Sequence, residues 1–208
     1  MGFYDRYIVP RMNDMMASGP EADAYRKRVL SSARGRVLEV GFGTGLNAAH
    51  YPSDVSHVTA LDPNPGVEKL AHKRIAAARV PIDLRRGSGS SLPFDDHSFD
   101  TVVTTLVLCS IDDVHAALAE IRRVLAPDGL YLLMEHGLAD DPGVRRWQHR
   151  LNSLQMLVAG GCRINRDMRP LIEGAGFRFE DVEQFYYPKA PRPAAFTTLG
   201  RATVAEAA

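Results

Sequence analysis

The stretch "VLEVGFGTG", residues 37–45, is an apolar run that breaks into three glycines spaced two residues apart. Glycine allows a sharp turn after a strand and lets the backbone approach a ligand closely. Ligands of open α/β sheets bind at the carboxyl ends of the strands. The stretch therefore predicts a buried strand, a ligand-binding turn and then a helix, and it raises the questions of which ligand binds and what chemistry follows.

Apolar runs of strand length alternate with helical patterns along most of the chain. We expect strands at 36–40, 57–61, 82–86, 99–108 and 129–136. The run 99–108 is apolar nearly throughout, as expected of a central strand that is covered on both faces. Helices are expected at 65–80 and within 112–129, the second with Asp112 as its cap. This alternation favours a doubly wound, mostly parallel α/β sheet, a Rossmann-like fold.

The C-terminal part of the chain has a different pattern. Asp141 and Pro142 are typical of the cap and the first position of a helix. The expected apolar stripe of this helix is Val144, Trp147, Leu151, Leu154 and Val158. Two β-rich stretches, 177–187 and 194–202, follow and are joined by a proline-rich link. They predict an antiparallel pair that completes a seven-stranded sheet.

Composition narrows the choice of partners and of cellular location. Lys plus Arg and Asp plus Glu both number 25, so the balanced charge gives no general attraction to nucleic acid or to an anionic membrane. The first 30 residues contain acids and no long apolar stretch, so we expect a cytoplasmic protein without stable membrane insertion. Two cysteines and seven scattered histidines lack the spacing of metal sites, and we expect no metal.

Three side chains around the glycines discriminate between ligands. Asp62 ends the second expected strand about 20 residues after the first glycine, where a carboxylate can bind ribose hydroxyls. Leu46 stands where the dinucleotide fingerprint needs its last glycine. Glu39, just before the turn, would repel a pyrophosphate and suits a cationic ligand. These residues argue against a NAD(P)-dependent oxidoreductase and favour S-adenosylmethionine (SAM), which carries an ammonium, a sulfonium and a ribose but no phosphate.

Several motifs together resemble a known family. "EVGFGTG", "LDPNP", "GSGSSLPFDDHSFDTVV" and "EIRRVLAPDGLYLLMEH" occur in the order and spacing of class I SAM-dependent methyltransferases of the ubiquinone-biosynthesis-like group. This resemblance covers roughly residues 35 to 136. Within that group, "TLVLCSI", "MEHG" and "GGCRINRD" resemble the thiol S-methyltransferases. The mammalian thiol enzymes begin with a hydrophobic membrane segment, and that feature is not carried over to this chain.

The resemblance implies a set of cofactor-binding residues. Gly41, Gly43 and Gly45 would line the methionine and ribose parts of SAM. Glu39 would hold the turn and the cofactor ammonium, and Asp62 would take the ribose hydroxyls.

The same resemblance places further residues around the adenine and the sulfur. Pro63 and Asn64 would lie beside the adenine. Ser88 stands where the family often has an acid that reaches the adenine amino group. Gly89 and Ser90 are expected beside that adenine contact. Thr105 and Leu106 are expected near the cofactor sulfur.

The acceptor side is less determined. His136, just past the fifth expected strand, is the candidate base or substrate contact, and a histidine that bonds a loop carbonyl is the alternative. Cys162 and Arg166, in a glycine-rich loop, are candidate substrate contacts, although Cys162 also suits a small buried position and Arg166 the start of a helix. Cys109 is expected in the core. Trp147 is expected to pack in the core or to form a substrate wall.

The N-terminal residues suggest a cover for the site. Residues 1–34 are expected to form a helical lid, from which Tyr4 and Tyr7 would reach the acceptor, with packing against the sheet edge as the alternative. We expect one domain over 1–208, with a variable substrate-side segment at 137–175. The predicted activity is methyl transfer from SAM to a small apolar molecule, with a thiol as the favoured acceptor. A lipid, quinone or phenol methyltransferase and a non-catalytic SAM-binding module are the alternatives, and the oligomeric state stays open.

Overall fold

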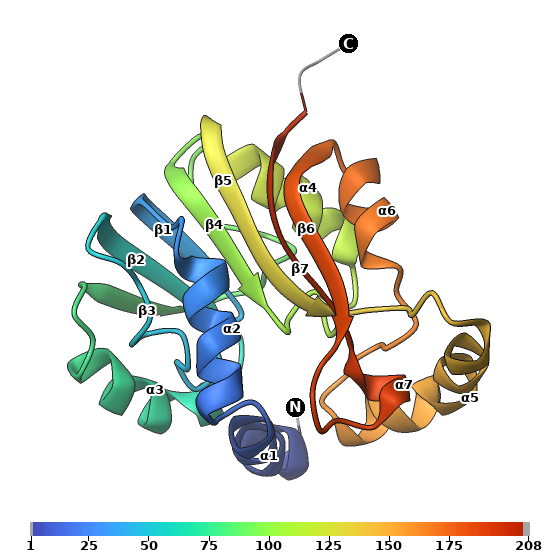
Figure 1. Ribbon diagram of the computed structural model, residues 1–208. Coiled ribbons are helices and arrows are strands. Elements are labelled where there is room, and N and C mark those ends of the chain that lie inside the picture. The colour runs from blue at the N-terminus through green and yellow to red at the C-terminus, as the bar shows by residue number, and fades with distance from the viewer. Residues whose placement is uncertain (1, 206–208) are drawn as a thin grey trace.

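A single mixed sheet organises the fold. Within residues 2–205, which the computed structural model describes, seven strands form: β1 Gly35–Val40, β2 Val55–Asp62, β3 Ile82–Arg86, β4 Phe99–Thr105, β5 Leu125–His136, β6 Phe177–Tyr186 and β7 Phe196–Val204. They pair in the order β3-β2-β1-β4-β5-β7-β6 (Figure 1). The first five strands are parallel, and β7 is antiparallel to both β5 and β6. The predicted α/β sheet with an antiparallel C-terminal pair is confirmed.

Helices cover both faces of this sheet. The helical segments are η1 Tyr4–Ile8 (π-helix), α1 Val9–Met16, α2 Pro20–Leu30, η2 Pro65–Val67 (3-10 helix), α3 Glu68–Ala76, α4 Val114–Val124, α5 Pro142–Val158, α6 Met168–Gly174 and α7 Arg192–Ala195. In Figure 1, α2 lies in front of the sheet and α4 behind it, whereas α1 and α5 lie at the carboxyl ends of the parallel strands. No helix in the described part of the chain has the length and apolarity needed to cross a bilayer.

The alternation of side chains along the central strands explains the two-sided cover. Leu38 in β1 belongs to the buried cluster that includes Leu118 and Ile121 of α4. Its neighbour Val37 belongs to the cluster that includes Leu30 of α2. Successive side chains of a strand point to opposite faces, so an apolar run of adjacent residues supplies both cores.

Strand β4 is shorter than the sequence predicts. It ends at Thr105 because Leu106 adopts a left-handed conformation, with φ of 58°, and the chain turns away from the sheet. For a leucine this conformation costs on the order of 1–2 kcal/mol. The Leu106 N–H still donates to the Met134 carbonyl at 2.8 Å, so the turn remains attached to β5.

Three expected helical features are wrong in detail. The stretch after the glycines, residues 46–50, forms turns instead of a helix, so this described stretch offers no helix N-terminus to a phosphate. The helix expected at 65–80 is η2 followed by α3, and it ends at Ala76. The cap of α4 is Asp113, whose carboxylate accepts from the Ala116 N–H at 2.9 Å, whereas Asp112 forms an ion pair with Arg163 at 2.6 Å.

Candidate functional site

The glycine turn after β1 is fixed to the end of β2. Gly41, Gly43 and Gly45 all have positive φ, a conformation that side chains with a Cβ rarely adopt. The N–H groups of Gly41 and Phe42 donate to the Leu61 carbonyl at 2.8 and 3.0 Å. A Cβ on Gly41 would lie 1.9 Å from the Val107 side chain, whereas a Cβ on Gly43 would meet no atom within 4 Å. Gly43 therefore faces open space, where a ligand can approach the backbone.

Asp62 holds the same turn from the neighbouring strand. One carboxylate oxygen accepts from the Gly43 N–H at 2.7 Å, and the other accepts from the Asn64 N–H at 2.8 Å. Burial raises the pKa of this carboxyl, and the two hydrogen bonds oppose the shift. Each carboxylate oxygen can accept more than one hydrogen bond, so Asp62 can position the turn and still accept from hydroxyl groups.

Glu39 is buried beneath the turn and is bonded to protein side chains. It is 2% exposed, and it accepts from Asn47 Nδ2 at 2.8 Å and from the Tyr51 hydroxyl at 2.6 Å. Burial raises its pKa to about 7, although these hydrogen bonds and nearby Arg26 act in the opposite direction. These two hydrogen bonds of Glu39 go to protein side chains, and its contact with the cofactor ammonium stays a prediction.

Asn47 and Arg26 complete that network, and sequence reasoning missed both. Arg26, which is 5% exposed, donates to Asn47 Oδ1 at 2.8 Å. The Asn47 amide also donates to Thr105 Oγ1 at 3.0 Å, so one amide links β1 with the end of β4. Arg26 carries no local signal, because it lies in the basic run "YRKR" beside similar residues.

The N-terminal helices contact the glycine turn directly. The Asp14 carboxylate of α1 accepts from Thr44 Oγ1 and pairs with Arg74 at 2.7 Å. Burial would raise the pKa of Asp14, but the Arg74 and Thr44 hydrogen bonds outweigh it and lower the pKa. A Cβ on Gly66 would lie 1.7 Å from the Arg6 carbonyl oxygen, so the segment before α1 packs against η2. Residues 2–34 contain the helical segments η1, α1 and α2 with turns between and after them, and the helical lid over 1–34 stays a prediction.

The remaining cofactor candidates lie at the same edge of the sheet. Asn64 caps η2 by accepting from the Gly66 N–H at 2.9 Å. Ser88 is exposed, and its hydroxyl lies 2.9 Å from that of Ser90. A Cβ on Gly89 would lie 2.6 Å from Val40 Cγ1, so only glycine fits there. Exposed Pro63 follows β2. Half-buried Thr105 is the last residue of β4, and half-buried Leu106 follows it. The structure brings the candidate residues together along the carboxyl ends of β1 to β4.

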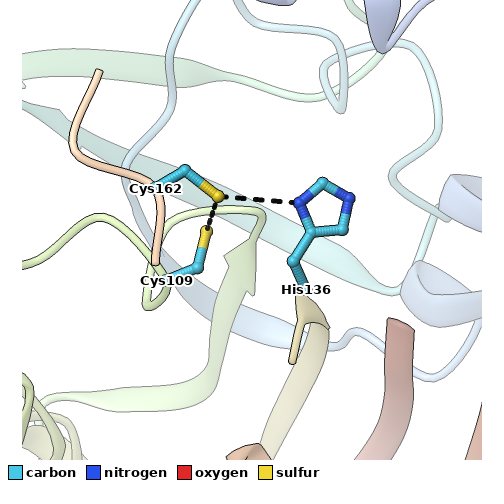
Figure 2. Close-up of side chains that lie close together, drawn as sticks. All are labelled: Cys109, His136 and Cys162. Carbon is cyan, nitrogen blue, oxygen red and sulfur yellow. Dashed lines mark hydrogen bonds between the residues drawn. The ribbon is translucent and has the colours of Figure 1, made fainter. Parts of the chain in front are cut away.

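Beyond the end of β4, two cysteines and a histidine gather (Figure 2). Cys162 Sγ lies 3.5 Å from Cys109 Sγ and 3.8 Å from His136 Nδ1. Cys109 is buried in the core, as expected, and His136 is half-buried as the last residue of β5. The contact between the sulfurs, together with burial, raises the pKa of the Cys109 thiol, whereas the same contact lowers the pKa of Cys162.

Arg166 has a role that the sequence did not predict. Its guanidinium donates to the carbonyls of Leu108 and Asp112, the second at 3.2 Å, so it braces the turn after β4. The N-cap position of α6 is Asp167, which makes no side-chain cap hydrogen bond. The start of a helix was therefore the wrong interpretation of Arg166.

The apolar stripe of α5 is largely outside the core. Trp147 is 54% exposed, and Leu154 and Val158 are also exposed. The prediction that Trp147 packs in the core is wrong. The helix is anchored instead through buried Val144 and Gln148. The Gln148 amide accepts from the Ala139 N–H at 2.9 Å and donates to the Gly137 and Pro193 carbonyls at 3.0 and 3.1 Å.

The N-terminal tyrosines lie beside the end of this helix. The Tyr4 hydroxyl donates to the Val158 carbonyl at 3.0 Å, which joins η1 to α5. Tyr4 and Tyr7 are both exposed, and Tyr7 contacts Phe3 with ring centroids 5.1 Å apart. Their contact with an acceptor stays a prediction.

Comparison with known proteins identifies the family of the chain. The model of a family described as "Methyltransferase domain" matches residues 38–133. Human thiol S-methyltransferase TMT1B is 33% identical over 203 residues, which cover 94% of this chain and 82% of that protein. Human thiol S-methyltransferase TMT1A is 38% identical over 146 residues, which cover 68% of this chain but only 59% of that protein.

Among solved structures, a SAM-dependent methyltransferase from Thermotoga maritima superposes with a TM-score of 0.67. The superposition covers 96% of this chain and 97% of that one at 19% sequence identity. At this identity the likeness shows the shared fold.

Proposed function

We propose that this chain, which belongs to the class I SAM-dependent methyltransferase family, transfers the methyl group of SAM to the thiol of a small molecule and so forms a thioether. SAM supplies an electrophilic methyl group on a sulfonium. The single observation that carries the proposal is that the glycine turn after β1 and the Cys109–His136–Cys162 group at the ends of β4 and β5 lie at the same edge of the sheet, in a relative of thiol methyltransferases.

The cofactor side supplies polar groups that suit SAM. The free acceptor capacity of Asp62 suits the ribose hydroxyls, and the open face of Gly43 lets the cofactor approach the backbone. The Asp62 carboxylate beside the Gly43 N–H favours an ammonium and a sulfonium over a phosphate. Pro63, Asn64 and Ser88 would border the adenine.

The acceptor side demands little acid–base chemistry if the acceptor is a thiol. A free thiol has a pKa of about 8.5, and its thiolate is a strong nucleophile. Displacement at the sulfonium methyl then requires alignment more than proton removal. We propose that His136 contacts the acceptor sulfur at the end of β5, and that the exposed side chains of Trp147 and Tyr4 contact its apolar part.

Two measurements test the proposal. Calorimetric titration with SAM, S-adenosylhomocysteine and NAD should show micromolar binding of the adenosyl ligands alone. An acceptor screen should then compare alkyl and aryl thiols with the phenols of the same shape. Turnover of the thiols supports the proposal, turnover of the phenols alone replaces the acceptor class, and SAM binding without any turnover would leave a SAM-binding module.

A blocking variant checks the place of the cofactor. Gly43→Val would put a side chain into the open space at a φ of 57°, and SAM binding should be lost. Gly174→Val is the matched control, since a Cβ there also meets open space, but at the end of α6 and without a positive φ. Normal SAM binding by a folded Gly43→Val protein would contradict the site.

A further inference from the structure

The group of Cys109, His136 and Cys162 comes from three separate segments of the chain. Cys109 lies in the turn after β4, His136 ends β5, and Cys162 lies in the loop between α5 and α6 (Figure 2). The two cysteines are 53 residues apart, and Cys162 is 26 residues from His136. No local spacing reveals such a group, which explains why the sequence led us to expect no metal.

Two of the three distances between the ligand atoms are close to those of a tetrahedral zinc site. Two thiolates bound to zinc at about 2.3 Å with tetrahedral angles are about 3.8 Å apart, and a thiolate and an imidazole nitrogen are about 3.5 Å apart. The two sulfurs lie 3.5 Å apart, and Cys162 Sγ lies 3.8 Å from His136 Nδ1. All three ligand atoms lie within 4.8 Å of one another, so small adjustments would let them share one ion.

The surrounding hydrogen bonds hold the cysteine-bearing segments together. The Arg163 N–H, next to Cys162, donates to the Cys109 carbonyl at 2.8 Å. Buried Glu135 accepts from the Val107 N–H at 3.1 Å and from the Cys109 N–H at 3.4 Å. The Arg166 guanidinium donates to the Leu108 carbonyl. The turn is therefore fixed before any ion binds, which lowers the entropic cost of assembling the ligands.

The ligand types select the metal. Two sulfurs and one imidazole nitrogen suit zinc and disfavour the oxygen-seeking magnesium and calcium ions. Two thiolates also balance the double charge of the ion, and this balance favours its burial beside Cys109 and Cys162, which are 1% and 6% exposed.

We propose that Cys109, His136 and Cys162 bind one zinc ion whose fourth position accepts the thiol substrate. Catalytic zinc sites have three protein ligands and keep one position open. His136, the least buried of the three residues, marks the side on which that position faces outward. Val107, two residues before Cys109, packs against Gly41 of the glycine turn, so the proposed ion lies next to the cofactor side.

The reaction step balances with these components. The acceptor thiol binds zinc and releases its proton to solvent, which leaves a zinc-bound thiolate at neutral pH. The thiolate sulfur then forms a bond to the methyl carbon as the bond from that carbon to the sulfonium breaks. The electron pair of the broken bond stays on the sulfur of S-adenosylhomocysteine. The neutral thioether product is a weaker ligand than the thiolate and leaves the ion. The identity of this fourth ligand rests on the proposed function, whereas the three-residue zinc site rests on the geometry alone.

The test begins with the metal itself. Chain purified under reducing conditions and analysed by mass spectrometry of metals should contain about one zinc per molecule, as a three-ligand site predicts. Chelated protein loaded with cobalt(II) should show thiolate-to-cobalt charge-transfer absorption and the visible bands of a tetrahedral ion. Addition of a small thiol should alter those bands. Absence of bound zinc and of the cobalt spectrum in reduced, folded protein would overturn the site, as would an oxidised preparation in which a Cys109–Cys162 disulfide is the stable native form.

Variants separate the site from the fold. His136→Asn and Cys162→Ser should each weaken zinc binding by more than about 100-fold, because each removes a direct ligand. His115→Asn, an exposed histidine on α4, should keep the wild-type affinity. Thermal unfolding of each protein identifies a variant that fails to fold, and two independent ligands keep the test decisive. Unchanged affinity in a folded His136→Asn protein overturns the assignment.

The same preparations distinguish this inference from the proposed function. Full thiol methylation by zinc-free enzyme would overturn the role of the fourth position and leave the proposed function intact. A zinc site whose cobalt spectrum responds to thiols, in a protein that binds SAM but methylates no thiol, would overturn the proposed function and leave the site intact. A cobalt spectrum that does not change when thiols are added overturns the assignment of the fourth position to the thiol substrate.

Discussion

The proposed cofactor side and the proposed acceptor side of this molecule are built in opposite ways. Around the glycine turn, the charged groups Glu39, Asp62 and Asp14 are bonded to protein partners, and the geometry is fixed. On α5, in contrast, large apolar side chains such as Trp147 and Leu154 are exposed. The difference teaches that hydrogen bonds among buried or half-buried groups fix the proposed cofactor side, whereas the proposed acceptor side leaves large apolar side chains uncovered.

The largest expected effect of a single change is on the fixed side. Asp62→Ala removes the proposed acceptor for ribose hydroxyls and also frees the Gly43 N–H, so SAM affinity should fall by at least about 100-fold, the range of a lost charge-assisted pair of hydrogen bonds. Calorimetric titration measures the affinity. Asp83→Ala on β3, whose carboxylate is exposed, is the control and should bind SAM normally. If the Asp62→Ala protein bound SAM with the wild-type affinity, Asp62 would have no part in SAM binding.

The buried Glu39 gives the fixed side a pH signature. Its pKa is raised from 4.5 to about 7, so between these values the folded state holds a proton that the unfolded state has lost. The free energy of unfolding should therefore decrease as pH rises through this window, by at most about 3 kcal/mol in total.

Urea unfolding at several pH values measures this dependence. Glu39→Gln, which cannot ionise, should reduce the slope, whereas half-buried Asp62 and buried Glu135, whose pKa values are also raised, retain a share. If the free energy of unfolding varied with pH in the same way for wild type and for Glu39→Gln, the raised pKa of Glu39 would be contradicted.

Gln148 tests how α5 is attached. Gln148→Ala would leave the buried Ala139 N–H and the Gly137 carbonyl without their partner, which should cost about 2 kcal/mol of unfolding free energy. Denaturant unfolding measures this cost. SAM affinity should change little, because these bonds lie on the acceptor side. A large loss of SAM binding would show that the two sides are coupled.

What the sequence could predict follows the same division. The sheet and the glycine turn were predictable because a continuous buried run and glycines with positive φ leave local signals in "VLEVGFGTG". Arg26 and Asn47 were missed because a buried polar partner is defined by its distant contacts. The group of Cys109, His136 and Cys162 was missed for the same reason.

The error at α5 has a different physical origin. An amphipathic pattern shows that a helix has an apolar face, but it does not show what covers that face. Val144 does pack in the core as the pattern predicts, whereas Trp147, one turn later on the same stripe, faces solvent. What covers the apolar face of α5 depends on where the chain after β5 places the helix in the fold. A local sequence pattern does not show this position.

The smallest expected effect on stability is at Trp147, and it is the sharpest test of the acceptor side. Trp147 is 54% exposed, so Trp147→Ser should change the free energy of unfolding by less than about 0.5 kcal/mol. If its ring contacts the acceptor, the KM for a bulky aryl thiol should rise several-fold while the KM for a small alkyl thiol and the affinity for SAM stay the same. Arg150→Ala is the matched control, because it removes the guanidinium that lies 5.6 Å from the ring centre and leaves the ring in place. Equal KM changes for both thiols, or none, would place Trp147 outside the acceptor surface, and a loss of stability comparable to that of Gln148→Ala would show that the ring is covered in solution.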